Sequence, residues 1–260
     1  MSFFGRFGLH NNLLSSQFMD MGIREEYHKW QSSVTGKEFE MLVFGHAGYP
    51  VILFPTSQGK YYQYKDQGLI ETARWFLEKG KVKIYCPDSM DAVSWYNKSV
   101  PPAERAYNQG LYDRLLLEEV VSRARHETGN ERIAVAGCSF GGYHAVNFAF
   151  RHPAITGYCW SMSGVFDIRT FTNGYYDDNV YFNNPVDFIP GAQDAGLWSM
   201  GIVLGTAQRD ICRGQNESLS GLLTAKNISH WLDIRPDRDH DWPVWKEMFP
   251  HYLSLLPGAV

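Results

Sequence analysis

Short apolar runs alternate with longer amphipathic segments along most of this 260-residue chain. The segments at 66–79 and 108–127 carry apolar residues at three- and four-residue spacing, the pattern of one helix face. Because strands that alternate with helices are joined by crossover connections, they lie parallel, with helices on both faces of the sheet. The alternation therefore predicts an α/β fold with a mostly parallel central sheet. The expected strands are 39–44, 51–55, 82–86, 133–137, 156–162, 201–205 and 228–234.

Two segments depart from this alternation. A short loop containing Gly45 and Gly48 joins the first two expected strands, which is typical of a hairpin, so we expect the sheet to start antiparallel. Residues 167–198 are rich in Asn, Asp, Tyr, Phe and Gly and show no clear period. We expect them to form an irregular lid or cleft wall. A chain of this length is within the range of one domain, and we take 1–260 as a single domain.

The charge balance and the apolar runs exclude several classes of protein. With 24 Lys and Arg against 28 Asp and Glu, the net charge is −4, which argues against a nucleic-acid or membrane-surface protein. The apolar runs are shorter than the ~18–20 residues that cross a bilayer. Residues 1–22 hold one Arg, broken apolar runs and no clear cleavage site, so they make a poor signal peptide.

The four cysteines, Cys86, Cys138, Cys159 and Cys212, occur singly. Three lie in or beside expected strands, where a buried thiol is the common state. We therefore expect a reduced, cytoplasmic protein. An aromatic content of 15% is compatible with exposed rings that pair subunits, so a monomer and a homo-oligomer both stay open.

The strongest local motif is Gly137-Cys-Ser139-Phe-Gly141, between an expected strand and a small-residue helix. A chain that turns sharply from strand to helix strains the backbone at its central residue, and glycines on either side remove side chains that would clash. The turn lifts the serine hydroxyl above the sheet, and the N–H of Phe140 at the helix start can stabilise an oxyanion. Ser139 is therefore the candidate nucleophile.

The candidate base is His240. In this architecture the acid and then the histidine follow the nucleophile along the chain. His152 ends the nucleophile helix, His230 lies in an apolar strand and His251 lies in the last helix pattern. His240 stands in a polar loop between the last strand and the last helix, where the base must lie to reach Ser139.

The candidate acid is Asp210, in the loop that follows the strand expected at 201–205. Two alternatives stay open. Glu217 starts the next helix pattern and is also explained as a first-turn charge. Asp167 follows the preceding strand, which is a known alternative place for the acid in such folds.

The sequence does not match the residue spacing of known metal-binding and cofactor-binding motifs. Asp237-x-Asp239-x-Asp241 begins like a calcium loop, but Trp242 and Met248 occupy its sixth and twelfth positions. The chain has no His-Glu-x-x-His and no phosphate-binding loop of the Walker type, and the glycines around the candidate serine do not fit a dinucleotide fingerprint. We expect no cofactor and no metal.

Three motifs together carry a resemblance. They are Gly-Cys-Ser-Phe-Gly-Gly-Tyr at 137–143, Ser-Met-Ser-Gly at 161–164 and His-Asp-Trp-Pro-Val-Trp at 240–245. Over roughly residues 25–255 the chain resembles the esterase family of the α/β-hydrolases, which includes S-formylglutathione hydrolases, feruloyl esterases and mycolyltransferases. The resemblance implies an α/β-hydrolase fold and a nucleophile, base and acid at Ser139, His240 and Asp210.

The chain departs from the family pattern after the second expected strand, where Phe54-Pro-Thr-Ser57-Gln58-Gly replaces a His-Gly or Asp-Gly. The second oxyanion donor is a backbone N–H, and by position Ser57 matches best, with Gln58 next. Trp95 and Tyr96 resemble an aromatic cleft wall of the family, although ordinary core aromatics explain them equally well.

The leading hypothesis is a serine hydrolase that cleaves small carboxylic esters through an acyl-enzyme on Ser139. The same three residues would serve an acyltransferase or a thioesterase, in which the acyl acceptor or the leaving group differs. A non-catalytic binding module is the third hypothesis, and the presence of all three residues in the expected order argues against it.

Overall fold

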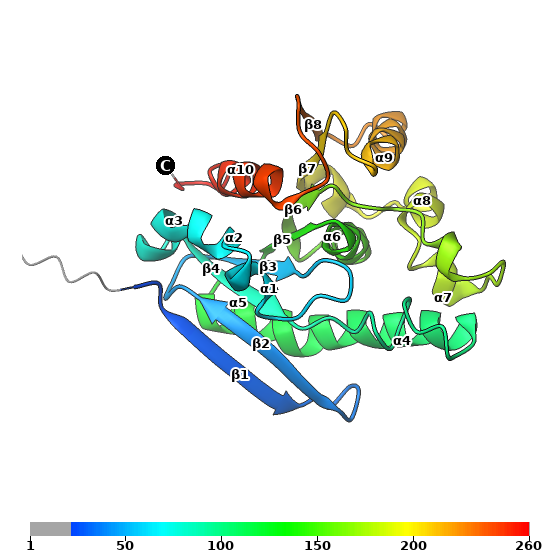
Figure 1. The fold of residues 1–260 in the computed structure, drawn as a ribbon, viewed down its shortest axis with the longest axis horizontal. Helices are drawn as coiled ribbons and strands as arrows, with labels where there is room; N and C mark the ends of the chain where they lie inside the picture. The colour runs from blue at the N-terminus through cyan, green and yellow to red at the C-terminus, as the bar shows by residue number, and fades with distance from the viewer. Residues whose placement is uncertain (1–21, 260) are drawn as a thin grey trace, which may run out of the picture.

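The computed structural model describes residues 22–259, so the N-terminal segment considered above as a signal peptide lies almost wholly outside the described residues. One eight-stranded sheet runs through the described part of the chain, in the order β1-β2-β4-β3-β5-β6-β7-β8 (Figure 1). The strands are β1 (Glu25–Gln31), β2 (Glu38–Phe44), β3 (Tyr49–Phe54), β4 (Val82–Pro87), β5 (Ile133–Cys138), β6 (Thr156–Met162), β7 (Gly201–Ala207) and β8 (Trp231–Arg235).

The pairing confirms a mostly parallel sheet with an antiparallel start. β1 pairs with β2 and β2 with β4 in antiparallel fashion, and every later pair is parallel. β3, β4 and β5 are buried at nearly every position, as strands covered on both faces must be.

The expected hairpin between the first two apolar runs is wrong. β3 does not pair with β2, because β4 lies between them. Skipping one strand position requires a span of about 10 Å, and the loop 45–48 can reach about 13 Å. Gly48 has φ +106 and its Cα lies against the Lys81 carbonyl, so the loop packs on the start of β4. The antiparallel hairpin is instead formed by β1 and β2, and β1 is not among the strands expected from the sequence.

The helices cover both faces of the sheet, as the alternation predicts (Figure 1). One face carries the long helical segment α4–η1–α5, helix α6 and helix α9, and the other carries the short helices α1 to α3 and the last helix α10. Their bounds are α1 (Gln63–Asp66), α2 (Leu69–Thr72), α3 (Arg74–Glu78), α4 (Pro102–Leu115), η1 (Leu116–Val121), α5 (Ser122–Thr128), α6 (Phe140–Arg151), α9 (Arg213–Ala225) and α10 (Trp242–Leu253).

The two helices expected from periodicity need correction. The segment 66–79 is not continuous, because Gly68 adopts φ +70 between α1 and α2 and a second break occurs at Ala73. The helix expected at 108–127 starts earlier, at Pro102, and its middle part η1 is a π-helix. It ends before Gly129, a left-handed C-cap, as expected.

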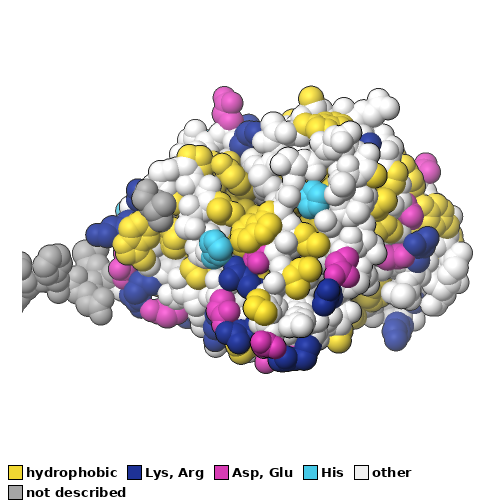
Figure 2. Space-filling model, turned by 90° about the horizontal axis from the view of Figure 1, so that it is seen from above, with side chains coloured by type: hydrophobic (Ala, Val, Ile, Leu, Met, Phe, Trp, Pro, Cys, Tyr) yellow, Lys and Arg dark blue, Asp and Glu magenta, His cyan; other side chains and the backbone are white. Residues whose placement is uncertain are grey.

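The described surface mixes charges of both signs. On the face drawn in Figure 2, Lys and Arg side chains lie beside Asp and Glu side chains. Exposed ion pairs such as Arg74–Glu71 and Arg238–Glu247 contribute to this mixture. Within residues 22–259, no helix is both long and apolar enough to cross a membrane.

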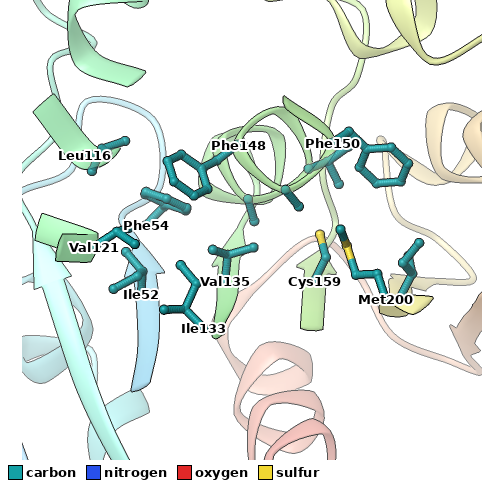
Figure 3. Packing of buried hydrophobic residues seen from close by; sticks show 14 of the residues in the cluster. Ile52, Phe54, Leu116, Val121, Ile133, Val135, Phe148, Phe150, Cys159 and Met200 are labelled. Atoms are coloured by element: carbon teal, nitrogen blue, oxygen red, sulfur yellow. The ribbon is translucent and has the colours of Figure 1, made fainter. Parts of the chain in front are cut away.

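The core between the sheet and α6 consists of large apolar side chains from both layers (Figure 3). Ile52 and Val135 of the sheet point towards Phe148 of α6, and Val121 of the long helical segment closes the side of the cluster. This packing fixes α6, and therefore the residue that precedes it, relative to the ends of the strands.

The segment 167–198 is more regular than expected. It contains the short helices η2 (Arg169–Phe171), α7 (Asp178–Tyr181), α8 (Pro185–Phe188), η3 (Ile189–Gly191) and η4 (Ala195–Ser199). Two buried asparagines anchor it: Asn184 Oδ1 accepts the N–H of Ile168 at 2.9 Å, and Asn183 Oδ1 accepts from Asn147 of α6 at 3.0 Å. Side-chain amides therefore support a segment whose buried apolar residues, such as Val180, Phe188 and Leu197, follow no helical period.

Candidate active site

Ser139 occupies the sharp turn between β5 and α6. Its backbone has φ 55 and ψ −121, a conformation that non-glycine residues rarely adopt. The N–H of Ser139 donates to the carbonyl of Met162 at 2.8 Å, which ties the turn to the end of β6. The serine is therefore held at the carboxyl ends of the strands, where parallel sheets present their sites.

The glycines around Ser139 are required by close backbone approach. A Cβ on Gly137 would lie 2.2 Å from the Gly141 carbonyl oxygen, and a Cβ on Gly141 would lie 2.2 Å from the carbonyl oxygen of Phe54. On Gly142 it would lie 2.5 Å from Ser161 Oγ. Only hydrogen at these positions lets α6 start directly against β3 and β6.

Gly141→Ala is expected to destabilise the fold by about 3 kcal/mol, because the new methyl group meets rigid backbone rather than a movable side chain. Urea denaturation measures this change. Gly221→Ala is the matched control, since Gly221 is an exposed helix residue with open space around its Cα. There alanine should stabilise by up to about 1 kcal/mol. Equal effects at the two positions would contradict the steric argument.

His240 lies between Ser139 and Asp210. Its Nε2 is 3.0 Å from Ser139 Oγ, and its Nδ1 is 2.8 Å from Asp210 Oδ1. The imidazole is 18% exposed, whereas the Asp210 side chain is completely buried. The ring of Trp245 packs edge-on against the imidazole at 5.1 Å and limits its rotation. The three residues thus form one continuous line of hydrogen bonds.

Asp210 is surrounded by donors. Its carboxylate accepts from the N–H of Cys212 at 2.7 Å and from the hydroxyl of Thr206 at 3.1 Å, as well as from His240. Burial raises the pKa of Asp210, but hydrogen bonds from His240, Ser163 and the Cys212 N–H outweigh it, so the net pKa lies below the ordinary range. The carboxylate therefore stays ionised while it orients the imidazole.

The loops that carry the acid and the base are bound to each other. Gln208 N–H donates to the Arg235 carbonyl at 2.9 Å, and Arg209 N–H donates to the Arg238 carbonyl at 3.0 Å. The Arg209 side chain also pairs with Asp239, next to His240, at 2.9 Å. As a result, residues distant in sequence hold a fixed separation at the site.

Ser163 is a site residue that the sequence reasoning did not single out. Its Oγ accepts from Trp245 Nε1 at 2.9 Å, and the residue adopts φ 59. It thereby holds in place Trp245, the residue whose ring packs on His240. The signal was present, because Ser163 belongs to the Ser-Met-Ser-Gly motif at 161–164.

The alternative acids lie elsewhere. Asp167 pairs with Arg169, and Glu217 forms an exposed ion pair with Arg213 at 2.9 Å. The other histidines have their own partners: His152 contacts Asp113, His230 contacts Ser220, and His251 contacts Arg235. Of the residues considered from sequence, the structure brings Asp210 and His240 to Ser139.

The two candidates for the second oxyanion donor differ in their hydrogen bonds. The N–H of Gln58 donates to Asp91 Oδ2 at 2.8 Å and is therefore already used. Among the described residues, no acceptor is found for the N–H groups of Ser57 and Phe140. The structure thus leaves Ser57 and Phe140 as the available pair.

The two aromatic residues considered for the cleft wall, Trp95 and Tyr96, also differ in burial and in hydrogen bonding. Trp95 is completely buried, and its Nε1 donates to the Tyr143 hydroxyl at 2.9 Å, which agrees with the core alternative. Tyr96 is only partly buried, and its ring lies edge-on to Phe140 at 5.2 Å. Its hydroxyl donates to Ser57 Oγ at 2.9 Å, so Tyr96 is the member of the pair that stands beside the site.

One set of metal-type donors occurs at the site. Asp210, Cys212 and His240 each offer one potential ligand atom, and these three atoms lie within 4.8 Å of one another. However, Asp210 and the imidazole already bond to each other, and burial raises the pKa of the Cys212 thiol to about 12. Because a protonated thiol is a poor metal ligand, this donor set suits hydrogen bonding better than coordination.

Comparisons with known proteins bear on the fold and the family of the chain. Among curated proteins, none matches the chain in sequence. Similar solved structures include an S-formylglutathione hydrolase from Staphylococcus aureus, with TM-score 0.71 and 14% identity over 90% of this chain and 98% of that one. A CE1 ferulic acid esterase from Anaeromyces mucronatus has TM-score 0.72 and 15% identity over 91% of each chain. The S-formylglutathione hydrolase of Agrobacterium tumefaciens gives TM-score 0.70 and 14% identity, over 90% and 94%.

These likenesses confirm the α/β-hydrolase fold. The family follows from the sequence itself, because the family model described as "Putative esterase" matches residues 36–255, most of the chain. The chain therefore belongs to this esterase family of the α/β-hydrolases, and the protein is an esterase-type hydrolase.

Proposed function

We propose that the protein cleaves small carboxylic esters through an acyl-enzyme intermediate, with Ser139 as nucleophile, His240 as general base and Asp210 as the orienting acid. The observation that supports this most is the line of hydrogen bonds from Ser139 Oγ through His240 to the buried carboxylate of Asp210, at 3.0 Å and 2.8 Å. A nucleophile, a base in contact with it and a group that orients the base are the three parts that such catalysis needs.

In this mechanism, His240 Nε2 takes the hydroxyl proton as Ser139 Oγ attacks the ester carbonyl carbon. The negative charge that forms on the carbonyl oxygen is accepted by the N–H groups of Phe140 and Ser57. His240 then returns the proton to the leaving alkoxide, and the C–O bond of the ester breaks. Water, activated by the same imidazole, cleaves the acyl-enzyme and regenerates Ser139. Tyr96 forms the wall beside the oxyanion.

Labelling with a fluorophosphonate tests the assignment directly. The purified protein is treated with the reagent, digested and analysed by mass spectrometry, and the phosphonyl group should be found on the peptide that contains Ser139. A panel of p-nitrophenyl, feruloyl and thioester substrates then defines the acyl and leaving groups. An unlabelled Ser139 in protein that hydrolyses esters would reject the proposed nucleophile.

The rate should depend on pH through His240. Protonated imidazole cannot accept the serine proton, so kcat/KM is expected to fall as the pH is lowered. The pKa of Asp210 is depressed, so its carboxylate stays ionised at pH values where an ordinary aspartate begins to protonate. The fall in kcat/KM should therefore reflect the uptake of one proton, by His240, and a plot of log kcat/KM against pH should have a slope of about 1. Stopped assays across the acid range measure it, and a two-proton slope would contradict it.

We also propose a cytoplasmic location. All four cysteines are buried and free in the described chain. Burial raises the pKa of the Cys138 and Cys159 thiols well above the ordinary value, which keeps them unreactive. Reduced, buried thiols are the usual state in a reducing compartment.

A further inference from the structure

Asp91 is a completely buried carboxylate near the catalytic residues, in the turn that follows β4. Both of its oxygens are used. Oδ2 accepts the backbone N–H of Gln58 at 2.8 Å, and Oδ1 accepts from His144 Nε2 at 2.8 Å. Because burying a charged group is costly, a carboxylate persists there only when its hydrogen bonds are satisfied. The catalytic mechanism above does not use this pair.

His144 lies in the second turn of α6, on the helix that Ser139 begins, and is only 2% exposed. Aromatic rings surround its imidazole, among them Phe140 at 5.1 Å and Tyr112 at 5.3 Å, both edge-on. The imidazole therefore has little freedom to turn away from Asp91. Through this contact the nucleophile helix holds Asp91, and Asp91 holds the loop after β3.

A second contact reaches the same loop from the same turn. The carbonyl of Asp91 accepts the N–H of Tyr96 at 3.0 Å, and the Tyr96 hydroxyl donates to Ser57 Oγ at 2.9 Å. The turn 91–96 thus holds Ser57 by its side chain and Gln58 by its backbone. Gln58 adopts φ 54, a left-handed conformation that costs energy for a non-glycine residue and needs support from its surroundings.

We propose that Asp91 and His144 are positioning residues for the oxyanion hole. They fix the peptide that carries the Ser57 N–H relative to the Phe140 N–H, so that both donors are in place before charge develops on the substrate. Because the Gln58 N–H is bound by Asp91, the second donor is the Ser57 N–H. Donors that are preorganised act on the transition state and not on the bound ester. This inference rests on the proposed ester hydrolysis at Ser139.

The test variant is Asp91→Ala, assayed on a p-nitrophenyl ester. The expected result is a fall in kcat of about 10²-fold, with KM changed by less than about 3-fold, since loss of one oxyanion donor has an effect of this size. The affinity for an alkyl boronic acid, which forms a tetrahedral adduct with serine, should fall by a similar factor. Asp91→Asn should retain most of the wild-type activity. Its amide oxygen can accept the N–H of Gln58, and its amide nitrogen can donate to His144 Nε2 when the imidazole proton is on Nδ1.

Asp113 supplies the matched control. It is also buried, and it pairs with the ring of His152, at the other end of α6, at 3.0 Å. It has no contact with the loop after β3. Asp113→Ala and Asp91→Ala should both lower the melting temperature, because each removes a buried hydrogen-bonded carboxylate, but Asp113→Ala should leave kcat and the boronic acid affinity unchanged.

A folded Asp91→Ala protein with wild-type kcat and boronic acid affinity would overturn the proposal. If that variant does not fold, His144→Phe decides, because it removes the hydrogen bond to Asp91 Oδ1 and keeps an aromatic ring in place. It should lower kcat about 5-fold at constant KM, the effect of one lost hydrogen bond, and an unchanged kcat would count against the proposal. Failure of the proposed function has a different signature, namely full activity of Ser139→Ala itself.

Discussion

Ser139→Ala is expected to lower kcat for p-nitrophenyl acetate by about 10⁶-fold, because alanine removes the atom that attacks the ester and no other group can replace it. KM should change little, since the methyl side chain leaves the oxyanion donors and Tyr96 in place. Alanine is no larger than serine and meets the same backbone requirement at this turn, where φ is 55, so the variant should fold. Initial rates measured at high enzyme concentration give the residual activity.

Ser218→Ala is the matched control for this substitution. Ser218 is exposed on α9, and its hydroxyl donates only to the Gly214 carbonyl at 2.8 Å. It should retain wild-type kcat and fluorophosphonate labelling. If Ser139→Ala retains more than about a thousandth of the activity, another nucleophile acts and the proposed function is wrong.

Asp210→Asn is expected to lower kcat by about 10⁴-fold. A neutral amide holds the proton on His240 Nδ1 more weakly than a carboxylate, and where its nitrogen faces the ring it donates to Nδ1 and selects the wrong tautomer for Ser139. Loss of the negative charge also removes the stabilisation of the imidazolium that forms in the transition state. Fluorophosphonate labelling should slow by a similar factor, which separates a slow nucleophile from a misfolded protein.

Asp167→Asn and Glu217→Gln are the controls for the acid. Both carboxylates pair with arginines, at Arg169 and Arg213, and neither contacts His240. Each change should alter kcat by less than about 3-fold, the size of an exposed ion-pair effect. Should Asp167→Asn be the damaging change and Asp210→Asn nearly silent, the acid is misplaced by one strand, while the Ser139–His240 contact stands.

The parts of the fold that sequence could predict are those whose signal is local. Strands β3, β4 and β5 are covered on both faces and therefore appear as continuous apolar runs. β1 has no such signal, because Glu25–Gln31 is an edge strand whose residues alternate between exposed and half-buried. The partner of β2 was also hidden, since the loop 45–48 fits a hairpin as well as a step across β4.

In the site, too, features carried by a short stretch of sequence could be predicted, and contacts between distant segments could not. Gly137, Ser139 and Gly141 follow one another in the chain, so the turn and its steric reason are visible in a short motif. Asp91 and His144 are separated by 53 positions, and each alone is an ordinary polar residue. Only the packing of α6 against the turn after β4 makes them a buried pair. The position after β3 favours Ser57 over Gln58 as the second donor, but the bond from the Gln58 N–H to Asp91 that supports this order is visible only in the structure.

The backbone at Ser139 also carries information about selection. A left-handed φ at a non-glycine residue costs on the order of 1–3 kcal/mol. Glycine would occupy this turn with less strain, and a lineage that used the fold only as a binding scaffold would gain stability by drifting to it. Serine at this position therefore destabilises the folded chain, and under the proposed function the hydroxyl that attacks the ester is what the chain gains in return.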